Sequence, residues 1–304
     1  MKDILEIAQD VTCALNHNAP VVALESSVIA NGLPPESAVE AAQAMEDAVR
    51  ESDSIPAITG VIDGVIKIGL SSDDIRRLAH KSAVKVSSRD LAHVVSRKLS
   101  GGTTVSATAR LAAAAGISVM ATGGLGGVHR GCPVDISSDL WELTRVPTVV
   151  VCSGPKAVLD VAATAEWLET HCVNVYGYQT DTLPAFYCGD SGLEVPRVED
   201  AADFGAMVKL LRGSLGVRSG IVLVVQPPQS LDIAADIEKA LAESEALRIK
   251  GKDVTPFLLS KVAELTGGRS VAANIALLRK NARVAGEVAV ELLREDRRRI
   301  GFMA

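Results

Sequence analysis

The sequence is poor in aromatic residues, which make up only 3% of its 304 residues although 48% are hydrophobic. Its apolar residues are mostly small or aliphatic, with abundant alanine, valine and leucine beside many glycines. Small side chains let helices lie close on a sheet, so this composition favours a layered α/β enzyme. A chain of this length can bury a large core, either as one domain or as two smaller ones.

The sequence also lacks the signs of a disulfide framework, a zinc site, a membrane span or a targeting segment. Its five cysteines are odd in number and contain no CxxC pair, which indicates a reducing compartment. No apolar run reaches about 18 residues, and the charged N-terminus has no apolar signal core. The formal net charge of -6 argues against non-specific binding of nucleic acid. We therefore expect a soluble, cytoplasmic protein that binds neither nucleic acid nor a membrane.

Short apolar runs alternate with helical patterns along the chain, as they do in α/β proteins. Asp63-Gly64 lies between two apolar runs and predicts a β-hairpin with a type I′ turn. The pattern predicts a three-layer α/β/α fold with a mostly parallel, mixed central sheet. No repeat or linker divides the sequence, which predicts a single domain over residues 1–304 with a helical C-terminal third. Buried strands are predicted at 21–24, 117–121, 148–152, 173–178 and 221–225.

A segment from Ala121 to Gly131 contains five glycines, a histidine and an arginine, and it follows a predicted strand. The segment matches the GxGxxG fingerprint only without its last glycine. In addition, Pro133 follows at the place where the fingerprint needs a helix. A dinucleotide site is therefore weakly supported. The glycines could contact an anion or a sugar, or could serve only turns that need positive φ angles. His129 and Arg130 in the same loop favour contact with a ligand.

Two carboxylates follow this loop and could bind a metal ion. Asp135 and Asp139 are four residues apart and would share one face of a helix if the segment is helical. Asp135 would then complement a helix N-terminus without any further function. The alternative is an oxygen-rich site for Mg²⁺ or Mn²⁺ that retains several waters. The pattern alone does not separate the two hypotheses.

Lys156 and Glu25 are candidate catalytic residues. Lys156 follows a predicted strand and is expected to open a helix, where the positive end of the dipole would favour the neutral, nucleophilic amine. The alternative is an exposed surface lysine. Glu25 comes directly after a predicted buried strand, where catalytic residues of α/β folds gather, although it could merely cap the next turn. Spacing alone does not distinguish Lys85 or Asn274 from structural residues.

In their order along the chain, these segments resemble the pseudouridine-5′-phosphate glycosidase family, which includes indigoidine synthase A-like proteins. The resemblance extends from about Pro20 to Leu292. There are departures: Ala30-Asn31-Gly32 stands where Ser-His-Gly is usual, and the loop between Gly131 and Asp135 is short. The segments that carry the resemblance are Val22-Ala23-Leu24-Glu25-Ser26, Lys85-Val86-Ser87-Ser88-Arg89-Asp90, Gly102-Thr103-Thr104-Val105-Ser106, the loop from Ala121 to Gly131, Asp135-Ile136-Ser137-Ser138-Asp139, Gly177-Tyr178-Gln179-Thr180 and Thr255-Pro256-Phe257-Leu258-Leu259.

The resemblance implies reversible cleavage of the C–C glycosidic bond of pseudouridine 5′-phosphate into uracil and ribose 5-phosphate. A carbon leaving group has no lone pair to protonate, so the two-carboxylate scheme of ordinary glycosidases does not suffice. Lys156 matches the family's nucleophile, which attacks C1′ and forms an imine-type adduct with the opened ribose. Glu25 matches the proton donor. Asp135 matches the ligand of Mn²⁺, with Mg²⁺ as the alternative ion, and no organic cofactor is implied.

The resemblance also implies a homotrimer and a set of substrate-binding residues, among which Lys85 is expected to meet the phosphate. Two other functions remain open: an imine-forming lyase or aldolase on another sugar phosphate, and a non-catalytic partner in a biosynthetic cluster. Intact Glu25 and Lys156 count against the second of these. The expected substrate-binding residues are Lys85, Val105, Ser137, Ser138 and Asp139, with His129 and Asn274 as further residues of the pocket.

Overall fold

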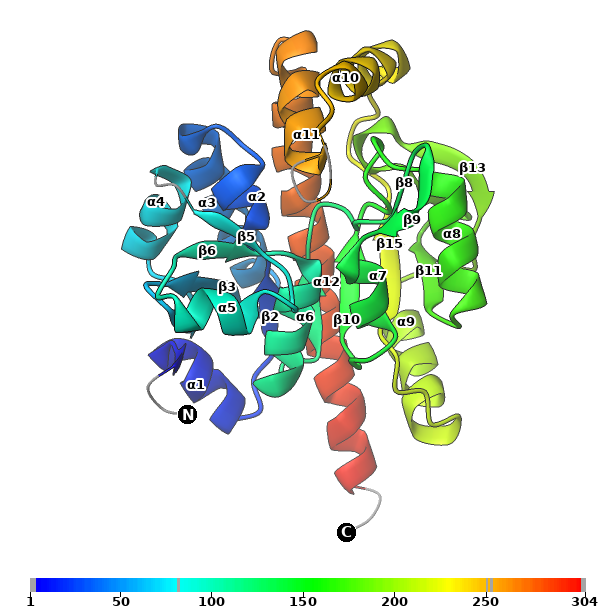
Figure 1. Cartoon of the computed structure of the whole chain (residues 1–304). Helices are drawn as coiled ribbons and strands as arrows, with labels where there is room; N and C mark the ends of the chain where they lie inside the picture. Colours follow the sequence, from blue (N-terminus) through cyan, green and yellow to red (C-terminus); the bar gives the residue numbers. More distant parts are fainter. Residues whose placement is uncertain (1–3, 81–82, 250, 252–253, 302–304) are drawn as a thin grey trace.

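A computed structural model describes residues 4–80, 83–249, 251 and 254–301, with side chains described as far as Arg294. In this part of the chain an eleven-stranded sheet forms the middle layer (Figure 1). Its strands are β1 (Leu5–Ile7), β2 (Val21–Leu24), β3 (Ile55–Ile62), β4 (Val65–Ile68), β5 (Val84–Val86), β6 (Gly101–Thr103), β7 (Val119–Ala121), β10 (Val149–Cys152), β11 (Asn174–Tyr178), β14 (Arg197–Val198) and β15 (Ile221–Val225).

The sheet is mixed but mostly parallel, as the sequence predicts. Its main path runs in the order β1-β4-β3-β2-β7-β10-β15-β11-β14, and β6 joins β5 to β3. The antiparallel pairs of this sheet are β3 with β4 and β3 with β6. Between β3 and β4, Asp63 has φ 49° and Gly64 has φ 83°. Both central residues of a type I′ turn need positive φ, so the predicted hairpin is confirmed.

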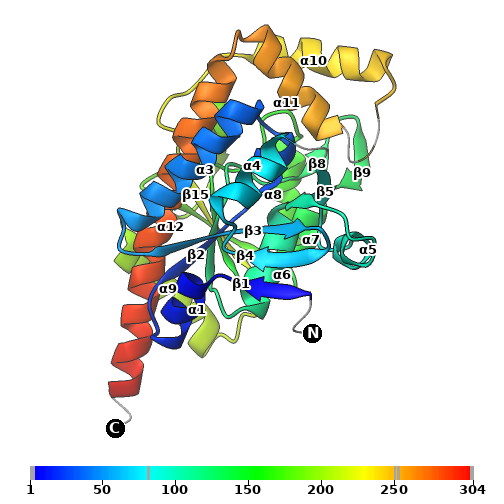
Figure 2. The same cartoon turned by 90° about the vertical axis from the view of Figure 1, so that its left-hand side faces the viewer.

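Helices cover both faces of the sheet, which confirms the three-layer architecture (Figure 2). Successive residues of a strand point to opposite faces, so in β2 Val22 and Leu24 join one core while Val21 and Ala23 join the other. The first core packs under α3 (Pro35–Arg50), α4 (Ser72–His80), α9 (Ala201–Lys209) and α12 (Arg269–Gly301). The second packs under α1 (Gln9–Asn16), α6 (Val105–Ala114), α7 (Ser138–Leu143) and α8 (Val161–Thr170).

The longest helix, α12, runs the height of the molecule beside α3 and behind the sheet (Figures 1 and 2). Gly286 permits the close approach of α12 to the end of α3: a Cβ atom on it would lie 3.4 Å from the carbonyl oxygen of Val49 and 2.6 Å from Cβ of Ser52, in the turn after α3. Within the described residues, no helix combines the length and apolar composition needed to cross a bilayer. The remaining helices are α2 (Ser27–Asn31), α5 (Leu91–Ser96), α10 (Ala234–Ala246), α11 (Val254–Leu265), the 3₁₀ turn η1 (Phe186–Cys188) and the π turn η2 (Leu210–Ser214).

One local expectation is wrong, because the helix expected from Lys156 begins at Val161, where Asp160 caps it by accepting a hydrogen bond from N–H of Ala163 at 2.9 Å. The condition for a shared helix face at Asp135 and Asp139 is not met: Asp135 belongs to β9 (Cys132–Ile136), which pairs with β8 (Val128–His129). The polar segment 189–194 contains β13 (Asp190–Glu194), which pairs antiparallel with β12 (Thr182–Pro184).

Candidate active site

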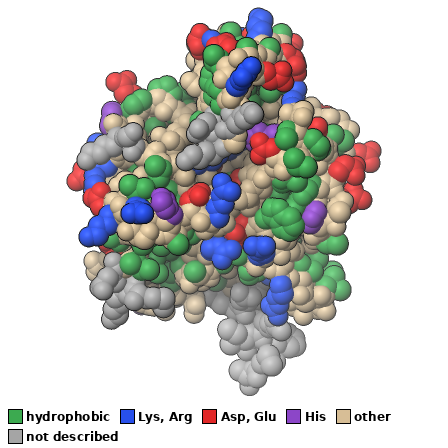
Figure 3. Space-filling view, viewed as in Figure 1, with side chains coloured by type: hydrophobic (Ala, Val, Ile, Leu, Met, Phe, Trp, Pro, Cys, Tyr) green, Lys and Arg blue, Asp and Glu red, His purple; other side chains and the backbone are tan. Residues whose placement is uncertain are grey.

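A cavity of about 630 Å³ opens beyond the carboxyl ends of the central strands. After β2 the chain continues to β3 on one side, whereas after β7 it continues to β10 on the other side. Open α/β sheets bind ligands at such a reversal of strand order. Figure 3 shows basic side chains gathered near the middle of the face that Figure 1 presents. The basic residues that line the cavity are Lys85, Arg89, Arg145 and Lys156.

The register of β2 against β7 brings Glu25 beside Thr122. Leu24 pairs with Ala121, so the next residues, Glu25 and Thr122, leave neighbouring strands at the same level. The Thr122 hydroxyl donates a hydrogen bond to Oε1 of Glu25, which is only 3% exposed. Burial raises the pKa of the Glu25 carboxyl above its usual 4.5, although the charge of Lys156 and the Thr122 hydrogen bond act in the opposite direction. A carboxyl whose pKa is raised holds its proton more tightly than usual, which suits it to act as a proton donor.

Lys156 is held in an irregular segment after β10, not at a helix N-terminus. Its N–H donates to the carbonyl of Leu125 at 3.0 Å, and N–H of Leu125 donates to the carbonyl of Gly154 at 2.9 Å. A side chain at Gly154 is excluded, since its Cβ would lie 1.8 Å from the carbonyl oxygen of Pro184. The expected helix dipole therefore does not act on Lys156. Its ammonium is instead the charge that most strongly lowers the pKa of Glu25, which indicates that the two groups are neighbours.

The glycines of the loop are required by close packing and not by positive φ. Gly131 is the exception, since it has a positive φ of 71° and open space where a side chain would lie. A Cβ atom on Gly126 would lie 2.2 Å from Oγ of Ser137, and one on Gly127 would lie 2.2 Å from Oγ1 of Thr164. One on Gly124 would lie 2.7 Å from the ring of Phe186. The turn-geometry hypothesis is therefore wrong for these positions, and the glycines let the loop lie against α7 and α8.

The two charged residues of the loop have different surroundings. His129 lines the cavity, and burial lowers the pKa of its imidazole below the usual 6.5, with Asp135 acting in the opposite direction. Arg130 is not among the residues that line the cavity. Its guanidinium donates to the carbonyls of Ala157 and Leu159, at 3.1 Å each, and pairs with Glu238 at 2.8 Å. Arg130 thus fixes the segment that follows Lys156.

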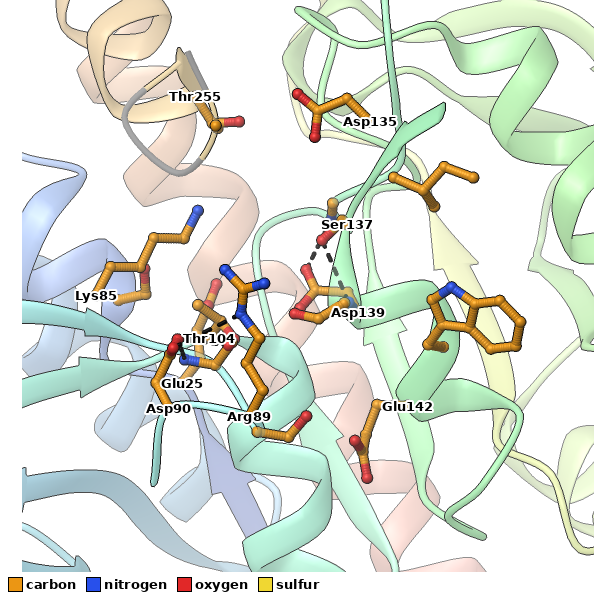
Figure 4. Close-up of a pocket in the computed structure, with 18 of the residues that line it drawn as sticks. Glu25, Lys85, Arg89, Asp90, Thr104, Asp135, Ser137, Asp139, Glu142 and Thr255 are labelled. Carbon is orange, nitrogen blue, oxygen red and sulfur yellow. Dashed lines mark hydrogen bonds and ion pairs between the residues drawn. The ribbon is translucent and has the colours of Figure 1, made fainter. Parts of the chain in front are cut away.

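Asp139 lines the cavity and also joins three elements. Its carboxylate accepts hydrogen bonds from N–H of Ser106 at 2.9 Å and from N–H of Gly126 at 3.0 Å. Ser137 caps α7 by accepting from N–H of Asp139 at 3.2 Å, and Ser138 contacts the Ser106 hydroxyl at 3.1 Å. Asp139 is 4% exposed, so its carboxylate mainly fixes the glycine loop against α6 and α7. Both serines line the cavity, and Figure 4 shows Ser137 beside Asp139.

Asp135 lies across the cavity from Lys85 (Figure 4). Lys85 reaches in from β5, the Asp135 carboxylate projects from β9, and Arg89 approaches between them. Oδ2 of Asp135 lies 3.9 Å from Nδ1 of His129, and its side chain is 41% exposed. Two bonds of about 2.1 Å to one ion can span that separation. Within the described residues no group of three or more His, Cys, Asp or Glu could hold a metal, so an ion here would keep most of its waters.

Two expected binding residues lie apart from this cavity. Val105 is buried in the core at the start of α6, and its neighbour Thr104 lines the cavity instead. Any contact of Val105 with substrate would therefore involve its backbone. Asn274, on α12, lines a recess of about 40 Å³ that also contains Asn31.

The sequence did not reveal Asn281, a fully buried amide on α12. Its Nδ2 donates to the carbonyl of Thr122 at 2.9 Å and to the hydroxyl of Ser153 at 3.1 Å. N–H of Ser153 also donates to the carbonyl of Gly123 at 2.9 Å. Asn281 thus joins the loop that contacts Glu25 to the loop that carries Lys156. A polar residue in a helical apolar pattern was the available signal, but its partners lie more than 120 residues away.

An acid and an amine that face one cavity are what an enzyme acting on a small polar molecule needs, and this chain is an α/β enzyme of that class. Residues 10–291 match the family described as indigoidine synthase A like protein, and the chain belongs to that family. It is 46% identical to the pseudouridine-5′-phosphate glycosidase of Dinoroseobacter shibae, over 96% of this chain and 98% of the relative. It is 47% identical to the enzyme of the same name from Chloroflexus aurantiacus, over 95% and 99% of the two chains.

Solved structures agree with the fold. The chain is similar to an indigoidine synthase A-like protein from Thermotoga maritima, with a TM-score of 0.88 and 36% identity over 95% of this chain and 97% of that one. It is similar to the prealnumycin C-glycosynthase AlnA in complex with ribulose 5-phosphate, with a TM-score of 0.88 and 35% identity over 97% and 99% of the chains. A sugar phosphate is thus the ligand of one neighbour.

Proposed function

We propose that this protein reversibly cleaves the C–C glycosidic bond of pseudouridine 5′-phosphate to give uracil and ribose 5-phosphate. The observation that carries the proposal is the pair formed by the buried, protonatable Glu25 and the amine of Lys156 in one cavity. The names of the relatives support the substrate. The volume of about 630 Å³ is sufficient for a nucleoside monophosphate.

In the proposed mechanism, Nζ of Lys156 attacks C1′ as a neutral amine, and the ribose ring opens as its ring oxygen takes a proton. The resulting adduct is an amine in which C1′ still carries the uracil carbon. The lone pair of Nζ then forms an iminium with C1′ as the C–C bond breaks, and the electrons of that bond pass to the uracil carbon, which takes a proton. Glu25 is the proton donor for ring opening and for the leaving carbon, helped by its raised pKa. Water then releases ribose 5-phosphate from Lys156.

The cationic side of the cavity suits the phosphate. We assign the phosphate to Lys85, with Arg89 and Arg145 lining the same cavity. Both arginines can contact phosphate oxygens in a bidentate manner. Ser137 and Ser138 are proposed to bind ribose hydroxyls, since both line the wall next to Asp139.

We further propose that Asp135 helps to hold a divalent cation, Mn²⁺ or Mg²⁺, chiefly through waters. Support comes from its exposed carboxylate and from the 3.9 Å separation between Asp135 and His129. Oxygen ligands with few protein contacts are typical of such hard ions. When bound, the ion would supply positive charge near substrate oxygens.

The proposal is tested by following uracil released from pseudouridine 5′-phosphate in the presence of Mn²⁺. Wild-type protein should release uracil, a chelator should slow the release, and Asp135→Ala should no longer respond to added Mn²⁺. Lys156→Ala should abolish turnover while substrate binding survives. Borohydride should trap ribose 5-phosphate on the wild type but not on Lys156→Ala. Folded wild-type protein that releases no uracil would refute the proposed activity.

A second candidate is an imine-forming enzyme that acts on another sugar phosphate. The similarity to the prealnumycin C-glycosynthase supports this second candidate, because the name of that neighbour indicates an aglycone other than uracil. An enzyme of this kind would trap ribose 5-phosphate on Lys156 yet leave pseudouridine 5′-phosphate intact. The same two assays therefore separate the candidates.

A further inference from the structure

The segment that carries Lys156 has no regular secondary structure of its own. It follows β10, and α8 begins only at Val161, so residues 153–160 lie between the two. The three residues after Lys156 are nonetheless at most 4% exposed and belong to the core that packs under α12. Buried backbone groups need hydrogen-bond partners, and a segment outside helices and sheets must find them elsewhere. What holds this segment therefore decides where Lys156 stands.

The glycine loop accepts hydrogen bonds from the N–H groups at both ends of the segment. N–H of Lys156 donates to the carbonyl of Leu125 at 3.0 Å, and N–H of Asp160 donates to the carbonyl of Val128 at 2.9 Å. The loop runs beside the segment like a neighbouring strand, with isolated bridges from Leu125 to Pro155 and from Val128 to Asp160. These contacts fix the two ends, and the carbonyls between them bond to a side chain of the same loop.

Arg130, at the end of that loop, binds two carbonyls in the middle of the segment. Nη2 donates to the carbonyl of Ala157 and Nε donates to the carbonyl of Leu159, at 3.1 Å each. Nε and Nη2 lie on one edge of the planar guanidinium, which presents two donors at a fixed spacing. Nη1 pairs with Oε1 of Glu238 on α10 at 2.8 Å. Since N–H of Leu159 also donates to the carbonyl of Lys156 at 2.9 Å, one guanidinium holds a turn that begins at Lys156.

We propose that Arg130 is a positioning residue for Lys156: by holding the turn that follows the lysine, it sets where Nζ stands relative to Glu25. This inference rests on the proposed function, in which Nζ attacks C1′. Arg130 is not among the residues that line the cavity, so it acts on the chemistry through the backbone next to Lys156. A misplacement of about 1 Å can cost about 100-fold in rate, so loss of this contact should slow formation of the adduct.

The first experiment measures kcat and KM for uracil release and the rate of borohydride trapping of ribose 5-phosphate on Lys156. Arg130→Ala should lower kcat and the trapping rate about 10- to 100-fold, with a much smaller change in KM, because the residues that line the cavity are all retained. Arg130→Lys keeps the charge but not the planar pair of donors, so it should recover only part of the loss. Wild-type trapping in Arg130→Ala would overturn the proposal.

Two variants serve as matched controls. Glu238→Gln removes the ion pair but leaves both carbonyl bonds of Arg130 in place. Arg197→Ala removes an arginine whose side chain is also 38% exposed but which pairs with Asp181 and Glu199. Surface ion pairs contribute little, so both variants should keep the wild-type rates. An equal loss in Glu238→Gln and Arg130→Ala would overturn the proposal, since the contact with α10 would then be the one that matters.

Hydrogen exchange gives a measurement that does not depend on activity. In Arg130→Ala the amides of Lys156, Leu159 and Asp160 should exchange faster than in the wild type, while those of β10 should not change. Faster exchange in β10 as well would overturn the proposal, because Arg130 would then act through overall stability. If the wild type traps no ribose 5-phosphate, it is the proposed function that fails, and exchange of these three amides alone decides whether Arg130 holds the segment.

Discussion

At the scale of single residues, the environment of Glu25 determines both its chemistry and its effect on stability. Burial raises the pKa of this carboxyl in the folded protein above its usual 4.5. The folded state therefore binds more protons than the unfolded state between the two pKa values. The free energy of unfolding consequently falls as pH rises from the pKa of Glu25 in the unfolded state to its pKa in the folded state. Above the folded-state pKa, the whole cost of burying the charged carboxylate remains.

Glu25→Gln should therefore separate activity from stability. Turnover should fall at least about 100-fold, because general acids contribute roughly 10²- to 10⁴-fold. At neutral pH the Tm should rise, since the amide is never charged. The difference in Tm should shrink as pH falls below 4.5, where the carboxyl becomes protonated in the unfolded state as well. A variant less stable than wild type at neutral pH would contradict this explanation.

How well single residues could be predicted depended on what surrounds them. Glu25 was found because it follows a buried strand directly, and a carboxylate at that position is a local signal. Thr122 was not singled out, since its contact with Glu25 depends on the register of two strands that are distant in the sequence. The dipole expected at Lys156 was wrong because Asp160 starts the helix later than the apolar pattern does.

At the scale of elements, periodicity predicted most of the sheet and failed at short irregular segments. The runs at 21–24 and 221–225 became β2 and β15 with the same bounds, because continuous apolar runs suit strands buried on both faces. The sequence left open whether the segment around Asp135 is helical, and in the structure it is a strand. Its two-strand hairpin with β8 depends on pairing, which the spacing of two carboxylates does not encode.

The contact of α12 with the site loops leads to a prediction about Asn281. Asn281→Leu removes the donor to the carbonyl of Thr122, at a cost of about 1–3 kcal/mol for a buried group left unpaired, whereas the carbonyl of Gly123 keeps the N–H of Ser153. We expect kcat to fall about 10- to 100-fold with a smaller change in KM, because the acid and the amine lose their relative position. Steady-state kinetics well below the measured Tm would show this.

Arg279→Ala is the control for that experiment, since Arg279 lies on the same helix but is exposed and forms an ion pair with Glu51 at the surface. Surface ion pairs contribute about 0–1 kcal/mol, so its kcat should stay near the wild-type value. Equal losses of kcat in both variants would mean that α12 acts through overall stability. Asn281→Asp, which keeps the shape but removes the donors, should resemble Asn281→Leu.

At the scale of the whole molecule, we expect the homotrimer that the family resemblance implies. Val134 at the hairpin beside the cavity is 86% exposed and Trp141 on α7 is 47% exposed, and such apolar surface is often covered by another subunit. Mass measurement in solution should give about 95 kDa, three times the 31.7 kDa of one chain. A species of one chain mass at micromolar concentration would contradict the expectation.

The pairing of Leu24 with Ala121 has a consequence for how the catalytic centre is assembled. Glu25 and its hydroxyl partner leave two adjacent strands of one continuous sheet, so ladder hydrogen bonds set their separation before any substrate arrives. No closure of one lobe upon another is needed to bring the acid and its partner together. The ordering of these groups takes place during folding and is not repeated in each catalytic cycle, which is what preorganisation of an active site means in physical terms.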